Sequence, residues 1–140
     1  MRDDAVLQAL TTRHYQFNHM VPAIPSQFVR LIDGLTLRMG DHDWHCISGQ
    51  GHAPEHIALH CPSLGVLISG DMVLPRISSN ISVFDTEPMA DPLRLFLLSL
   101  NKFQGISADC LVLPSHGKPF KGLHTRIAQL KAHHMARLDR

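Results

Sequence analysis

Three polar side chains that can bind a metal follow three short apolar runs of this sequence. His56 ends the segment 51–56 (Gly-His-Ala-Pro-Glu-His), Asp71 comes fifteen residues later, and His116 comes forty-five residues after that. Zinc and iron accept imidazole and carboxylate ligands, and a carboxylate can bridge two metals that activate a hydroxide. Loops at strand ends are places where a rigid sheet aims side chains. A metal-dependent hydrolase is therefore one function that these residues suggest.

Composition and charge narrow the class of protein. The chain has 140 residues, of which 44% are hydrophobic, as expected for one domain with a core. The formal net charge is +1 and the basic residues are scattered, so nothing indicates a nucleic-acid surface. No apolar run approaches the roughly 20 residues that span a bilayer, and no signal-peptide pattern opens the chain. We expect a cytoplasmic protein with a small-molecule substrate and no nucleic-acid or membrane partner.

Cysteine and histidine content adds two observations. The three cysteines (Cys46, Cys61 and Cys110) each lie in an apolar run, which predicts reduced, buried thiols. Eleven residues are histidines, an unusual number for a chain of this length. Histidine binds metals and carries protons, but the count alone assigns neither role.

The elements that must position the three side chains follow from hydrophobic periodicity. Spacing predicts a helix over about 4–19, ended by Pro22 and Pro25. Residues 26–34 are ambiguous and end in an Asp-Gly turn. Alternation predicts four short strands, the first two forming a hairpin, over residues 35–39, 44–48, 57–61 and 66–68.

The second half of the chain predicts a loop, a helix, a strand and a helix. Residues 72–90 form an irregular stretch of the kind that often borders a site. Asp91 and Pro92 favour a helix start, and an apolar stripe continues to Gly105 (Leu93, Phe96, Leu97, Leu100 and Phe103). A buried strand is predicted over 110–113 and a final helix over 122–140. This order is typical of an α/β (α+β) fold.

The three chemical segments together resemble the later motifs of the metallo-β-lactamase superfamily. Residues 51–56, 69–71 (Ser-Gly-Asp) and 114–117 (Pro-Ser-His-Gly) match in order and in strand context. The resemblance is to the branch that includes glyoxalase II-like hydrolases and β-lactamase-like proteins. It implies half of an αββα sandwich with a C-terminal helical tail. It also implies a helix and connector over 1–25 and the C-terminal half of such a domain over 26–140.

The resemblance implies roles for single residues. His56 would bind the first metal, Asp71 would bridge both metals as the catalytic carboxylate, and His116 would bind the second metal. His52 and Ser115 would contact these ligands and orient them without binding the metal themselves. The implied cofactor is zinc, as one or two ions, with iron and manganese as alternatives.

One part of the family pattern is missing from this sequence. The signature His-x-His-x-Asp-His belongs upstream of these motifs, and His42 and His45 have its residue types without its spacing. The chain therefore resembles the C-terminal half of a hydrolase that attacks an ester, thioester, lactone or phosphodiester. Arg76 on the loop would contact an anionic substrate. We expect the chain alone to be inactive.

Two other interpretations stay open. The chain could be a non-catalytic module that acts as an assembly partner, because half a sandwich would leave the stripe beginning at Leu93 and the strand edges uncovered. That predicts a homo-oligomer or association with the missing N-terminal half. The histidines of the last helix (His124, His133 and His134) could form another metal site, but adjacent helical positions face different ways. A polar helix face, with His133 or His134 bonded to residues 114–117, is the simpler account.

Overall fold

The structure is a computed structural model that describes residue 23 and residues 25–138. The helix predicted over 4–19 lies outside the described residues. The chain divides into two compact units, Met1–Arg30 and Leu31–Arg140. The described residues of the first unit form no helix or strand. The interpretation of residues 1–25 as a helix and connector stays a prediction, and the following description concerns the second unit.

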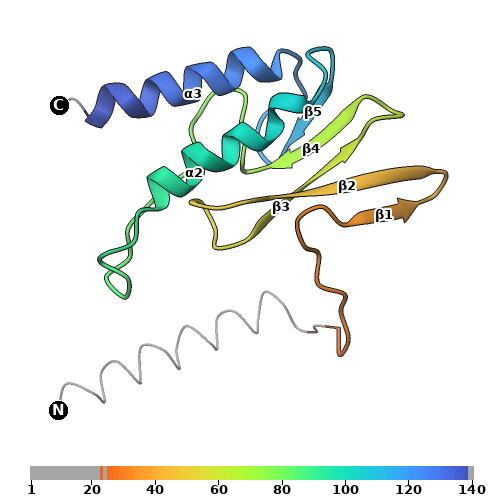
Figure 1. Ribbon diagram of the computed structural model, residues 1–140, viewed down its shortest axis with the longest axis horizontal. Helices are drawn as coiled ribbons and strands as arrows, with labels where there is room; N and C mark the ends of the chain where they lie inside the picture. Colours follow the sequence, from red (N-terminus) through yellow and green to blue (C-terminus); the bar gives the residue numbers. More distant parts are fainter. Residues whose placement is uncertain (1–22, 24, 139–140) are drawn as a thin grey trace. The chain divides into compact units, whose positions relative to one another are not determined.

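A single five-stranded sheet forms the base of the second unit (Figure 1). Its strands follow one another across the sheet in chain order: β1 (Thr36–Met39), β2 (His42–Gly49), β3 (His56–Cys61), β4 (Val66–Gly70) and β5 (Leu111–Pro114). The first four strands pair antiparallel, whereas β4 and β5 pair parallel. The predicted strands and the predicted hairpin of β1 and β2 are confirmed.

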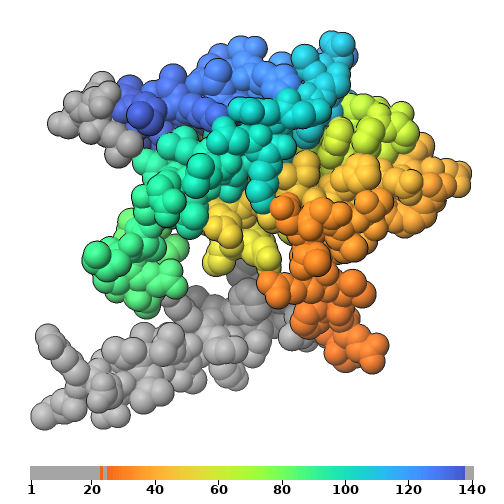
Figure 2. Space-filling view, viewed as in Figure 1, coloured from red at the N-terminus to blue at the C-terminus, as the bar shows by residue number. Residues whose placement is uncertain are grey.

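Two helices lie on one face of this sheet, α2 (Pro92–Leu100) and α3 (Leu123–Leu138) (Figure 1). As predicted, Asp91 caps α2, because its carboxylate accepts a hydrogen bond from the Arg94 backbone N–H at 2.9 Å. The helix passes into a 3₁₀ turn, η1 (Asn101–Gly105). Figure 2 shows the surfaces of α2 and α3 side by side. The predicted α+β class is therefore confirmed.

The hydrophobic core lies between the helices and the sheet. Alternate strand residues such as Leu67 and Val112 point into it and are fully buried. The helices contribute the other large members of this cluster, among them Phe96, Leu100, Phe103, Leu123 and Leu130. All three cysteines are buried and unpaired by disulfides, as predicted. None of the helices in the described part of the chain is long and apolar enough to cross a membrane.

One expectation about this core was wrong. We expected the apolar stripe of α2 to lack a cover, but Phe96 and Leu100 are fully buried against the sheet. Part of the accessible apolar surface lies on the opposite sheet face, where Leu59, Ile68 and Leu113 stand in register across three strands. Ile68 is 37% exposed. The helices thus cover one face of the sheet, and the other face carries the accessible apolar row.

Candidate metal centre

The candidate site lies at one edge of the sheet. Because β3 is antiparallel to both neighbours and β5 is parallel to β4, the ends of β2, β4 and β5 meet at the same edge. His52 follows β2, Asp71 follows β4 and His116 follows β5. The chain path therefore gathers residues from all three chemical segments, as their positions after apolar runs predicted.

The Asp71 carboxylate stands between two imidazoles. Its Oδ2 lies 3.5 Å from Nε2 of His52, and its Oδ1 lies 3.5 Å from Nε2 of His116. Asp71 and His52 are partly buried, whereas the His116 side chain is 70% exposed. Each carboxylate oxygen thus faces one imidazole nitrogen, an arrangement in which a carboxylate can bridge two cations.

The His52 ring is oriented by a backbone carbonyl. Its Nδ1 lies 2.8 Å from the carbonyl oxygen of Asn80. A carbonyl only accepts, so Nδ1 carries a proton, and a neutral ring then keeps its lone pair on Nε2, toward Asp71. A lone pair facing a carboxylate oxygen is unfavourable unless a proton or a metal cation lies between them. The hydrogen bond from Nδ1 to the Asn80 carbonyl is the kind of contact that orients metal-binding histidines in proteins.

His56 does not face the carboxylate, which differs from the expectation that it is the ligand. Its Nε2 accepts a hydrogen bond from the backbone N–H of Asp71 at 3.1 Å. Its Nδ1 is buried and has no hydrogen-bond partner. Burial lowers the pKa of His56, the Asp71 charge opposes that effect, and His52 adds to it. In this geometry the His56 ring contacts the Asp71 backbone and the His52 ring faces the carboxylate, whereas the role of each histidine toward a metal stays a prediction.

Two glycines permit this geometry. Gly70 has a φ of +54°, and a Cβ there would come within 2.3 Å of the His56 ring. Gly51 has a φ of +101°, and a Cβ there would come within 2.5 Å of the Pro92 carbonyl oxygen. Glycine is the residue that adopts a positive φ at little cost and admits such close approach. The His56 ring therefore packs under the turn that carries Asp71, and the segment before His52 packs directly on α2.

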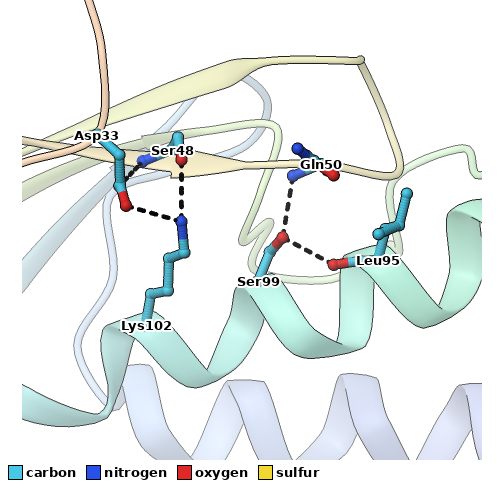
Figure 3. Close-up of polar contacts among 6 residues, drawn as sticks. All are labelled: Asp33, Ser48, Gln50, Leu95, Ser99 and Lys102. Atoms are coloured by element: carbon cyan, nitrogen blue, oxygen red, sulfur yellow. Dashed lines mark hydrogen bonds and ion pairs between the residues drawn. The ribbon is translucent and has the colours of Figure 1, made fainter.

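Hydrogen bonds from α2 and η1 fix the end of β2 just before the first chemical segment (Figure 3). The Ser99 hydroxyl accepts from the Gln50 backbone N–H at 3.0 Å and donates to the Leu95 carbonyl at 2.7 Å. Ser99 is 6% exposed, so this link is shielded from water. Sequence reasoning missed it, because the two residues are far apart in the chain and neither has a distinctive local pattern.

A second link lies beside the first (Figure 3). The Lys102 ammonium contacts Oδ2 of Asp33 at 3.0 Å and donates to the Ser48 hydroxyl at 2.9 Å. The Ser48 backbone N–H donates to Oδ1 of Asp33. These two donors, the Ser48 backbone first and Lys102 second, lower the pKa of the Asp33 carboxyl. The sequence alone predicts only a turn at Asp33.

The loop after β5 reaches the site through its backbone. The Ser115 N–H donates to the Gly70 carbonyl at 3.1 Å, which ties the segment before His116 to the segment before Asp71. The Ser115 side chain is exposed. The support that Ser115 gives to the site therefore runs through its main chain. Beside His116 lies a cavity of about 480 Å³ that Arg76 and Lys118 also line.

The donor set fits part of a metal shell. Two ligands at zinc distances and tetrahedral angles lie about 3.3 Å apart, close to the 3.5 Å separations at Asp71. Among the described residues, however, no group of three or more His, Cys, Asp or Glu side chains is placed to hold one ion. Each carboxylate oxygen has one imidazole partner, so each ion would receive two protein donors from this set.

The histidines of α3 are not gathered around a common point. The His124 Nε2 lies 2.8 Å from the Ile106 carbonyl oxygen. The His134 Nε2 lies 2.7 Å from the Ser78 hydroxyl. The His133 ring packs edge-on against the His134 ring, with the two ring centres 5.3 Å apart. The predicted contact of His133 or His134 with residues 114–117 is therefore replaced by a contact of His134 with the loop after Asp71.

Comparison with known proteins identifies the family. The sequence profile of the metallo-beta-lactamase superfamily matches residues 7–129, and the chain belongs to that superfamily. The resemblance drawn from residues 51–56, 69–71 and 114–117 is thereby confirmed. A comparison with curated protein sequences gives no match.

Two solved structures are similar over most of this chain. A β-lactamase domain protein from Burkholderia ambifaria is 57% identical, with a TM-score of 0.83 over 88% of this chain. A metallo-β-lactamase family protein from Thermus thermophilus is 31% identical, with a TM-score of 0.74 over 82% of this chain. In both comparisons the matched region covers 38% of the other protein. The chain thus spans well under half the length of these relatives.

Proposed function

We propose that this chain forms one side of a metal-dependent hydrolase site, with His52, Asp71 and His116 as metal ligands. The observation that carries the proposal is the Asp71 carboxylate, whose two oxygens each face a histidine Nε2 at 3.5 Å. Membership of the metallo-β-lactamase superfamily supports it. His52 replaces His56 among the proposed ligands, because the Nε2 of His56 already accepts from the Asp71 backbone.

The proposed cofactor is zinc, as one or two ions, with iron or manganese as alternatives. When bound, such an ion supplies an activated water and polarises the group that is attacked. The residues of this chain would hold the ion and orient its ligands. Asp71 would bridge the ions, the hydrogen bond to the Asn80 carbonyl would orient the Nε2 of His52 toward them, and His56 would hold the turn that carries Asp71. The proposed substrates are esters, thioesters, lactones or phosphodiesters, with Arg76 contacting an anionic group.

Two donors per ion imply weak binding by the chain alone. Catalytic zinc sites in proteins ordinarily use three protein ligands and leave one position open. We propose that the remaining ligands come from a polypeptide segment with the His-x-His-x-Asp-His signature, which this sequence does not contain. The chain alone should then bind zinc weakly and hydrolyse a chromogenic ester no faster in the presence of zinc than in its absence.

Equilibrium dialysis against zinc tests the proposed ligands. The unmodified chain should retain zinc above the background of a chelator-treated sample, and Asp71→Asn should lose most of that zinc. Asp43→Asn is the matched control, because it removes a carboxylate that is exposed and paired with Arg38, away from the site. Equal zinc retention by Asp71→Asn and Asp43→Asn would contradict the assignment.

A second candidate function is that of an assembly module, and the accessible face of the sheet favours it. The side chains of Ile68 and Leu111 are 37% and 36% exposed there, next to Leu59 and Leu113. We propose that this face packs against a second copy of the chain, with a polypeptide that carries the His-x-His-x-Asp-His signature as the alternative partner. Sedimentation of the chain alone should show a dimer that Ile68→Lys dissociates and Met89→Lys, at an exposed loop position, does not. A monomer at tens of micromolar would count against a second copy.

A further inference from the structure

A cavity of about 740 Å³ lies between α3 and the loop that follows Asp71. Five cationic or potentially cationic side chains line it: Arg76, Arg126, Arg137, His133 and His134. No aspartate or glutamate of the described residues lines it. Its volume lies within the range of small-molecule sites in proteins, which is roughly 300–1,000 Å³. The cavity is therefore large enough for an organic ligand and has a strongly one-sided charge.

The positive charge of the three cavity arginines is not balanced by ion pairs with carboxylates in the described part of the chain. None of these three arginines forms an ion pair with a described carboxylate, although the whole sequence is nearly neutral at +1. Burial lowers the pKa of Arg126, and burial, then His133 and Arg137, lower the pKa of His134. Gathering like charges where water is partly excluded is unfavourable, and an anion bound among them would remove that cost.

The walls of the cavity are held in place without a ligand. The Arg126 guanidinium donates from Nε to the Leu74 carbonyl at 2.6 Å and from Nη2 to the Ile77 carbonyl at 3.0 Å. His134 and Ser78 join the same loop to α3. Since a guanidinium has five N–H groups, Arg126 keeps donors for a ligand after these bonds and one to Gln129. A cavity ordered in this way loses less entropy on binding.

We propose that this cavity binds a small phosphate-bearing ligand. Guanidinium groups match phosphate oxygens with paired N–H donors, and three of them line the cavity. Ile81, Leu93 and Leu130 supply an apolar wall for the organic part of such a ligand. Asn80 also lines the cavity, and its carbonyl holds His52. Asn80 therefore lies between the proposed ligand and the candidate metal centre. Binding of this ligand does not require a metal at Asp71.

Isothermal titration calorimetry with inorganic pyrophosphate tests this inference. The full chain is titrated at low ionic strength with excess EDTA, so that phosphate cannot bind through a metal at Asp71. Arg137→Gln should weaken binding about tenfold, the effect of one lost charge-assisted contact. Arg137 is exposed, so the variant should keep its fold, which circular dichroism checks. Lys121→Gln is the matched control, because it removes one exposed positive charge outside the cavity.

The results that would overturn the inference are distinct. Undetectable binding by the unmodified chain would do so, and so would an equal loss in Arg137→Gln and Lys121→Gln, which would indicate diffuse charge attraction. Asp71→Asn should bind pyrophosphate unchanged, and a loss there would place the anion at the metal centre instead. Tight binding of a single-stranded RNA without measurable binding of pyrophosphate would replace the small ligand with a nucleic acid.

Discussion

The backbone N–H of Asp71 donates to the Nε2 of His56 across 3.1 Å. This bond separates the functions of two histidines that lie four residues apart. The Nε2 lone pair of His56 accepts the hydrogen bond from the main chain, which fixes the turn that carries Asp71. His52 is left to present its own Nε2 to the Asp71 carboxylate, with its Nδ1 held by Asn80.

Removing the His56 ring should reduce stability more than removing the His52 ring. His56→Ala leaves a backbone N–H without its partner and empties a half-buried position, which should cost about 1–3 kcal/mol of the free energy of unfolding. His52→Ala removes a partly exposed side chain and should cost about 1 kcal/mol or less. Urea unfolding in the presence of EDTA measures both. A larger loss in His52→Ala would show that His56 is not the supporting residue.

Gly70→Ala should be markedly destabilising, and Gly65→Ala is its matched control. Both glycines have similar positive φ values, +54° and +63°, so both substitutions incur the cost of a left-handed backbone, about 1–2 kcal/mol. Only at Gly70 would the new Cβ strike the His56 ring, while nothing lies within 4 Å at Gly65. Overpacking should add about 1–3 kcal/mol at Gly70. Equal midpoints of thermal unfolding for the two variants would contradict this packing.

Ser99→Ala should loosen the connection between α2 and the end of β2. The Gln50 backbone N–H would lose its acceptor in a partly buried setting, at a cost of about 1–2 kcal/mol. Lys102→Ala removes the neighbouring exposed link to Asp33 and should cost about 0–1 kcal/mol. Hydrogen exchange at the Gln50 amide should accelerate in Ser99→Ala. If exchange accelerates equally in Lys102→Ala, Ser99 is not the specific anchor.

Stability should decrease as the pH falls below neutrality. Burial lowers the pKa of His60, with His45 adding to the effect, and burial also lowers the pKa of His134. The unfolded chain takes up protons at about pH 6.5, whereas these folded-state groups take them up only at lower pH. The unfolded state therefore binds more protons in that interval, and the free energy of unfolding falls as the pH is lowered from about 6.5 toward the lowered pKa values. Urea midpoints across this range measure the slope, and His60→Gln should flatten it. A midpoint that rises on acidification would be the wrong sign.

Much of the fold was predictable because its signals are local. Alternation over residues 35–39 predicted β1, and Asp91 followed by Pro92 predicted the start of α2. The meeting of segments 51–56, 69–71 and 114–117 at one sheet edge followed from their positions at strand ends. These features depend on neighbours in the chain, which a sequence displays directly.

The choice between His52 and His56 was not predictable in this way. It depends on the turn at Gly70 and on the close approach of Gly51 to α2, both of which are tertiary contacts. The cover over Phe96 was missed for the same reason, because the sheet face that buries it comes from distant segments. Four residues of separation between two histidines carry no information about which ring turns toward a carboxylate.

We propose that His52 and His116, with Asp71 between them, hold the metal. The most direct measurement is a zinc titration of the chain followed by the ¹⁵N chemical shifts of the histidine rings. Zinc should shift the Nε2 signals of His52 and His116 and leave the Nε2 of His56 unchanged, and Asp71→Asn should suppress the shifts. A zinc-dependent shift at His56 Nε2 with none at His52 would contradict the account and restore His56 as the ligand.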